Sequence, residues 1–99
     1  MGESVDYWGQ IKCKDKEEAK EVEKCINGIE GLGWEVFRYG DTVEFLESNG
    51  WRGGGASCKE LLDEWFKPLT EKFPHLGFDV QCTYNDQAPT YPVRVGVSE

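Results

Sequence analysis

The segment from Trp34 to Glu47, WEVFRYGDTVEFLE, contains two runs of mixed apolar and polar residues around a Gly-Asp pair at 40–41. Aromatic and β-branched residues are frequent in both runs, and such residues favour extended strands. A glycine next to an aspartate is typical of a tight turn. The segment therefore predicts a β-hairpin, with one strand over 34–39 and the next over 42–47.

A strand and then a helix are predicted on the N-terminal side of this hairpin. Residues 7–13 alternate, with Tyr7 and Ile11 on one face and Trp8 on the other. Asp15 is a suitable N-cap, and glycines at 28, 31 and 33 are suitable terminators for the helix that follows. Four apolar residues recur at helical spacing within it, namely Ala19, Val22, Ile26 and Ile29.

A loop, a broken helix and two strands are predicted on the C-terminal side. We expect residues 48–56 to form the loop and Ser57 to cap the helix. Pro68 lies inside the apolar stripe of this helix, which predicts a kink or break near Lys67. Alternation then predicts a strand over 77–84, a turn-rich loop, and a short last strand over 93–97.

This order of elements predicts one α+β domain over residues 1–99. Strand, helix, strand, strand, helix, strand is the ferredoxin-like split β-α-β pattern (βαββαβ), here with a short additional C-terminal strand. We expect an antiparallel sheet with two helices on one face. In that arrangement the first strand lies beside the third and the fourth.

The four cysteines are predicted to be reduced core residues. Their spacing contains no Cys-x-x-Cys pair, so no metal site is expected. All four fall on positions of the pattern that face the core, where a thiol behaves as a small apolar side chain. Cys13 and Cys82 could be neighbours on adjacent strands, although a disulfide there is not expected in a reducing compartment. The others are Cys25 and Cys58.

The charge of the chain limits its partners. The 99 residues include 19 acidic and 11 basic side chains, for a net charge of -8. Direct binding to nucleic acid or an anionic membrane needs positive charge, so neither is expected, whereas a basic protein surface is compatible. The polar N-terminus does not resemble a signal peptide, and we expect a cytosolic protein. Acidic charge also has a simpler role in keeping a small protein soluble.

Residues 47–86 contain a series of motifs. Trp51 lies in a polar segment, a helix with Leu61, Trp65 and Leu69 follows, and FPHLGF at 73–78 leads into a strand. This series resembles the YubB-like ferredoxin-fold proteins of phages and plasmids. The resemblance implies the same fold and a mobile-element origin, and it implies no activity.

Two surfaces are candidates for binding. If the helices cover one face of the sheet, the other face carries Trp8, Glu44 and Asp79, and the hairpin adds either Phe37 and Tyr39 or Trp34 and Val36. Such a mixed aromatic and acidic face suits a protein partner or self-association, unless the C-terminal strand and loop cover it. Further members of the face are Gln10, Lys12, Leu46, Gln81 and Thr83.

The second surface is the glycine-rich segment 50–57. Its candidate residues are Trp51, Arg52, Gly53, Gly54 and Gly55. Backbone N–H groups of such a loop, when it enters a helix, can bind a phosphate, and Arg52 would supply the positive charge. No phosphate-binding motif of known type is complete here, so a flexible crossover loop is the alternative interpretation.

No group of residues indicates catalysis. His75 is the only histidine, and the sequence shows neither a partner nor a cleft for it as a general base. Acidic pairs such as 17–18 and 63–64 are typical of solvated helix faces. We therefore expect no catalytic residue, no metal and no cofactor.

Two functions remain. The first is a non-enzymatic protein-binding module of phage or plasmid type, monomeric or homodimeric. It would inhibit a host defence or nucleic-acid-binding protein, as an anti-CRISPR protein does. The second is a small-ligand or nucleotide-binding domain that uses the segment 50–57.

Overall fold

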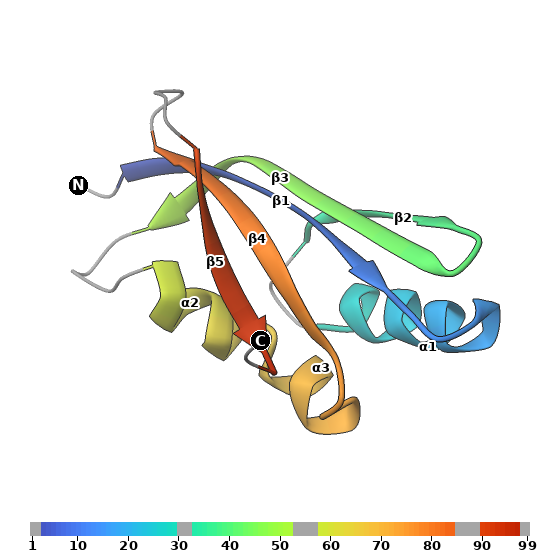
Figure 1. Ribbon diagram of the computed structural model, residues 1–99. Helices are drawn as coiled ribbons and strands as arrows, with labels where there is room; N and C mark the ends of the chain where they lie inside the picture. The colour runs from blue at the N-terminus through green and yellow to red at the C-terminus, as the bar shows by residue number, and fades with distance from the viewer. Residues whose placement is uncertain (1–2, 30–32, 53–57, 85–89, 98–99) are drawn as a thin grey trace.

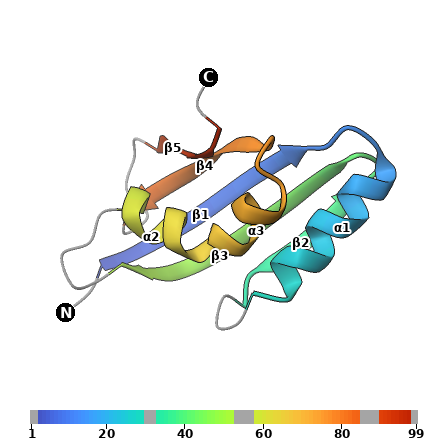
Figure 2. The same ribbon diagram turned by 90° about the horizontal axis from the view of Figure 1, so that it is seen from below.

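The computed structural model describes residues 3–29, 33–52, 58–84 and 90–97, which form an antiparallel sheet packed against helices. Figure 1 shows the helices on one side of the sheet, and Figure 2 shows them from that side. The strands are β1 (Glu3–Lys12), β2 (Glu35–Tyr39), β3 (Thr42–Arg52), β4 (Gly77–Tyr84) and β5 (Tyr91–Gly96). The helices are α1 (Lys16–Asn27), α2 (Cys58–Trp65) and α3 (Lys67–Lys72).

The strand order of the sheet is β2-β3-β1-β4-β5. The prediction that the first strand lies between the third and the fourth is confirmed, because β1 pairs antiparallel with both. The order differs from the four-stranded ferredoxin-like form in that β5 pairs with β4 and extends the sheet. Since β5 lies at the edge, it does not cover the side of the sheet away from the helices.

The helix boundaries follow the local chemistry that the sequence predicts. The side chain of Asp15 accepts a hydrogen bond from the backbone N–H of Glu18 at 2.8 Å, as an N-cap does. Gly28 caps the other end of α1. The break at Pro68 is confirmed, because α2 ends at Trp65 and α3 begins at Lys67. The predicted cap Ser57 lies outside the described residues.

The expected loop over 48–56 is wrong for its first half. β3 continues through Arg52, because β1 starts at Glu3 and supplies a pairing partner along the added length. The register pairs Glu3 with Arg52 and Ser4 with Trp51, and it shifts between Val5 and Tyr7. The polar and glycine residues at 49–50 favour a loop when they are considered locally. The strand forms there because a distant segment of the chain pairs with it.

The core lies between the sheet and the helices and is rich in aromatic rings. Trp34 stacks on Tyr7 with ring centroids 5.1 Å apart, and Phe45 lies 5.1 Å from Phe66. Trp65 meets Trp34 edge to face at 5.8 Å. Edge-to-face and offset stacking are the favoured arrangements of buried rings. Two of the tryptophans therefore belong to the core.

Gly9 allows this core to approach β1 closely. A Cβ at this position would lie 2.6 Å from Cζ of Phe45 and 3.0 Å from the carbonyl oxygen of Asp79. The first distance is shorter than the contacts that real Cβ atoms make, and the second is tighter than most of them. The absence of a side chain at Gly9 is what lets the Phe45 ring pack across the central strand.

We predict that Gly9→Ala lowers the free energy of unfolding by about 1–3 kcal/mol through overpacking. Urea denaturation followed by circular dichroism measures this change. Because Phe45 supplies the clash, the cost of Gly9→Ala should be smaller in a Phe45→Leu background than in the natural sequence. An equal cost in both backgrounds would contradict the steric explanation.

Candidate functional site

The side of the sheet away from the helices, here called the open face, carries aromatic and charged side chains in rows across the strands. One row pairs Phe37 with Glu44 and Glu44 with Gln10. The next pairs Leu46 with Trp8 and Trp8 with Gln81. No described helix covers this face, as Figure 1 shows. Its other described members include Asp6, Lys12, Glu35, Tyr39, Thr42, Asp79, Thr83, Pro92 and Arg94.

Three aromatic side chains on this face are in contact with solvent. Trp8 is 42% exposed, Phe37 is 40% exposed and Tyr39 is 61% exposed. The sequence left two alternatives for β2, and the structure selects Phe37 and Tyr39, since Trp34 and Val36 pack against the core. Exposed rings on a flat sheet are common at protein-binding surfaces.

Glu44 is the polar centre of the open face. Its Oε2 atom accepts a hydrogen bond from Nε1 of Trp8 at 2.9 Å and another from Nε2 of Gln10 at 3.3 Å. These bonds hold the indole over β3. The sequence placed Trp8 and Glu44 on the same face, and the structure brings them into contact.

The remaining predicted site residues are separate from this contact. Asp79 lies on the open face on β4, where its Oδ1 is 3.4 Å from Nη1 of Arg94. Trp51 and Arg52 end β3, so they belong to the sheet rather than to a loop. The predicted glycines Gly53, Gly54 and Gly55 lie outside the described residues.

Sequence reasoning missed the role of Gln10 as a second donor to Glu44. The predicted pairing of the first and third strands brings Gln10 and Glu44 to adjacent strands, but it does not say which residues lie opposite each other. Their register depends on where the hairpin turns, and one residue of slip would change every cross-strand pair.

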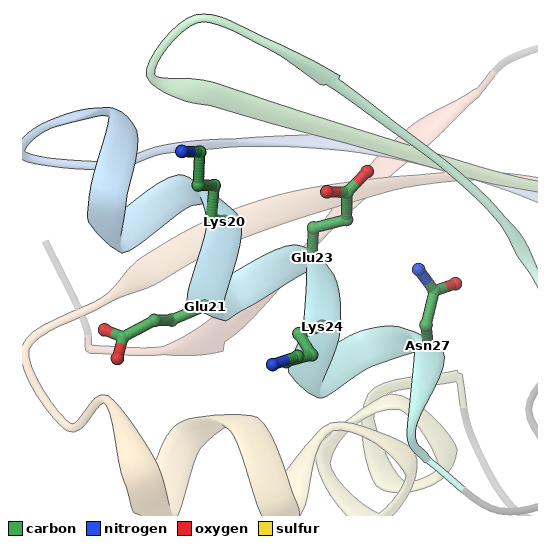
Figure 3. Close-up of a pocket in the computed structure, with 5 residues that line it drawn as sticks. All are labelled: Lys20, Glu21, Glu23, Lys24 and Asn27. Carbon is green, nitrogen blue, oxygen red and sulfur yellow. The ribbon is translucent and has the colours of Figure 1, made fainter.

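A separate hollow lies along α1, and the side chains that line it do not point toward a common centre. Its volume is about 420 Å³, and its lining consists of Lys20, Glu21, Glu23, Lys24 and Asn27. Figure 3 shows these side chains fanning out from the helix in different directions. Glu23 is already paired with Arg38 at 3.0 Å. The hollow is therefore a groove beside a charged helix surface rather than a built binding site.

His75 has a partner that the sequence did not show. Its Nε2 lies 2.6 Å from Oε2 of Glu18, whose side chain is only 4% exposed. The other carboxylate oxygen of Glu18 accepts the backbone N–H of Lys14 at 2.9 Å. Burial alone would raise the pKa of Glu18, but the hydrogen bonds from Lys14 and His75 outweigh it and hold this pKa below its ordinary value of 4.5.

One oxygen of Glu18 thus binds the backbone just before α1, and the other joins this helix to the turn before β4. A carboxylate whose folded pKa is lowered stabilises the fold above its ordinary pKa, and this contribution disappears as pH falls through the lowered value. The expectation that His75 is a surface or turn histidine is confirmed, since its side chain is 57% exposed in the turn before β4. Its partner Glu18 was not visible in the sequence. Because both oxygens of Glu18 are bonded within the protein, we assign the pair a structural role.

We predict that Glu18→Gln lowers the free energy of unfolding at neutral pH by about 1–3 kcal/mol, as expected for lost charge-assisted hydrogen bonds. The difference from the natural protein should shrink as pH falls below 4.5. Urea denaturation at a series of pH values measures both effects. The adjacent Glu17→Gln is the matched control, because the Glu17 side chain is 82% exposed and should matter little. Equal costs for the two changes would contradict the assigned role.

The sequence left open that Cys13 and Cys82 are neighbours, and the strand register contradicts this. Cys82 lies opposite Tyr7, and Cys13 is six residues further along the chain, roughly 20 Å for an extended strand. A disulfide needs Cα atoms within about 7 Å. The neighbour of Cys82 is Cys58, whose Sγ is also 3.4 Å from Oη of Tyr91.

All four cysteines carry free thiols, as predicted. Burial raises the pKa of Cys82 to about 12, with a further increase from the adjoining Cys58. Burial and the nearby Glu18 raise the pKa of Cys13 to about 11. The pKa of the half-buried Cys25 is raised by burial too. Such thiols are poor nucleophiles.

We predict that iodoacetamide at about pH 8 labels Cys25 first in the native protein, because the other three thiols are buried and are reached only by unfolding. Peptide mass spectrometry over time measures the order. Labelling in denaturant is the control, in which all four should react. Labelling of Cys82 as fast as Cys25 in the native protein would show that the core is open near β4.

Within the described ranges, no group of three or more His, Cys, Asp or Glu side chains is placed to hold a metal ion. In the same part of the chain, no helix combines the length and the apolar character that a membrane crossing requires.

Comparison with known proteins gives no relative. No family model, no curated protein and no solved structure matches the chain. The chemistry of the open face is therefore the basis for the functional argument.

Proposed function

We propose that this chain is a non-enzymatic protein-binding module whose open face docks onto a partner with a basic surface. The observation that carries the proposal is a sheet face that no described helix or strand covers, on which Trp8, Phe37 and Tyr39 are exposed beside acidic residues. Exposed aromatic rings supply the buried contact area of protein interfaces, and they tend to dominate the binding energy.

The charges of the open face favour a basic partner. Its described cations are already paired, because Lys12 contacts Asp41 at 2.9 Å and Arg94 contacts Asp79 at 3.4 Å. Glu35 and Glu44 form no ion pair with any described residue. With a net charge of -8 for the whole chain, the face would attract a basic protein and repel nucleic acid.

The ferredoxin-like arrangement with an added edge strand belongs to the same proposal. Its support is the placement of β1 between β3 and β4 and the β2–β3 hairpin that joins two strand-and-helix units. A mobile-element origin, a cytosolic location and inhibition of a host defence or nucleic-acid-binding protein, as by an anti-CRISPR protein, are consistent with this proposal. Such host proteins expose basic surfaces for their own ligands.

Two charge reversals of the same kind test the docking surface. Glu35→Lys changes the open face, and Glu21→Lys makes the identical change on the exposed side of α1. We predict that tagged natural protein and Glu21→Lys retain the same stoichiometric partner from host lysate, and that Glu35→Lys loses it. Salt of about 0.5 M should release the partner, because charges are then screened over a few ångströms.

Retention alone does not decide the question. The partner identified by mass spectrometry must be purified, must carry a basic surface and must reproduce the variant pattern in calorimetry. If the two charge-reversal variants retain every partner equally, or if the partner has an acidic surface, the proposal of docking through the open face is wrong.

A further inference from the structure

Glu44 is flanked by aromatic residues on both neighbouring strands. Phe37 of β2 is its direct cross-strand partner. On the other side, Trp8 of β1 reaches diagonally to its carboxylate through the 2.9 Å hydrogen bond. Neighbouring strands are about 4.8 Å apart, so the strands that carry the two rings are separated by roughly 10 Å, with the carboxylate between them.

The carboxylate of Glu44 is only partly used by the protein itself. The hydrogen bonds from Trp8 and Gln10 both end on Oε2. Within the described residues, Oε1 accepts no hydrogen bond and no lysine or arginine pairs with Glu44. Lys12, on the same face, has its Nζ 2.9 Å from both carboxylate oxygens of Asp41 instead.

A carboxylate with one unbonded oxygen between two half-exposed rings suits a planar cation as its ligand. A cation over the face of an indole or phenyl ring is attracted by the ring quadrupole, and tryptophan is the strongest of these partners. A guanidinium is planar, so it stacks on a ring while its N–H groups bond a carboxylate. A lysine ammonium is strongly hydrated and makes point contacts, so it exploits this geometry less well.

The geometry points to an arginine-binding site on the open face, in which a guanidinium of the partner lies between Trp8 and Phe37 and donates hydrogen bonds to Glu44. This inference rests on the proposed docking function, because it names the chemistry of the partner residue that the open face selects. The partner is a protein segment with an exposed arginine.

The direct test uses defined peptides rather than an unidentified partner. Isotope-labelled protein is titrated with a Gly-Arg repeat peptide and with Gly-Lys and Gly-citrulline peptides of the same length. The indole N–H signal of Trp8, assigned by comparison with Trp8→Phe, is the reporter, together with the backbone amides of Phe37 and Glu44. We predict that the arginine peptide shifts these signals to saturation. The lysine peptide should bind at least about fivefold more weakly, and the neutral citrulline peptide should not bind.

A conservative pair of variants separates the site from the general charge of the face. Glu44→Gln keeps an acceptor for Trp8 and Gln10 but removes the charge, and we expect about tenfold weaker binding of the arginine peptide. Glu35→Gln removes the same charge from β2 on the same face and should weaken binding much less. Both side chains lie at the surface, so both variants should fold.

The outcomes distinguish this inference from the docking proposal. Equal affinity for the arginine and lysine peptides, equal effects of the two variants, shifts elsewhere on the protein, or no shifts at all would each overturn the arginine site. If the purified partner is lost by Glu35→Lys but bound normally by Glu44→Gln, docking stands and the arginine site is wrong. If neither change affects the partner, the open face is not the docking surface.

Discussion

β1 is the strand on which both faces of the sheet depend, the core face and the open face, because it pairs with β3 on one side and with β4 on the other. Its alternation places Tyr7 and Ile11 in the core and Trp8 on the open face. A slip of one residue would exchange the two sets, and burying the aromatic core opposes such a slip. Gly9 then lets the Phe45 ring cross the strand. The geometry of the open face is therefore imposed by the packing of the core beneath it.

Two glutamates show how differently the same side chain is used. Glu18 is buried, and its oxygens are engaged by the backbone of Lys14 and by His75, so it fastens α1 to the turn before β4. Glu44 is half-buried on the open face, and both of its hydrogen bonds with described residues end on one oxygen. A carboxylate that is fully engaged inside the protein stabilises the fold, whereas one with an unused oxygen beside exposed rings has capacity for a ligand.

Local signals made much of this fold predictable. The N-cap at Asp15, the break at Pro68 and the turn at Gly40 each follow from the chemistry of one or two residues, and the alternation of β1 and β4 separates core from surface. The extension of β3 through Arg52 was not predictable, because it depends on pairing with Glu3 and Ser4 far away in the chain. The same limit applies to the pair of His75 and Glu18 and to the proximity of Cys58 and Cys82, which only the tertiary arrangement brings together. Trp8 and Glu44 could be placed on one face, but their contact depended on the register.

The distribution of charge on the open face separates two contributions to partner binding. The net charge of -8 belongs to the whole chain and acts at long range, so in the proposed docking it would affect mainly how fast a basic partner arrives. In the proposed complex, Trp8, Phe37 and Glu44 would act only in contact, where burial of the rings and a charge-assisted hydrogen bond would slow dissociation. Among the described residues, Lys12 and Arg94 are paired with Asp41 and Asp79, so in the proposed complex the cation that complements Glu44 is supplied by the partner. In the proposed docking, charge would bring many basic proteins to the face, and the spacing of two rings around one carboxylate would determine which of them stay.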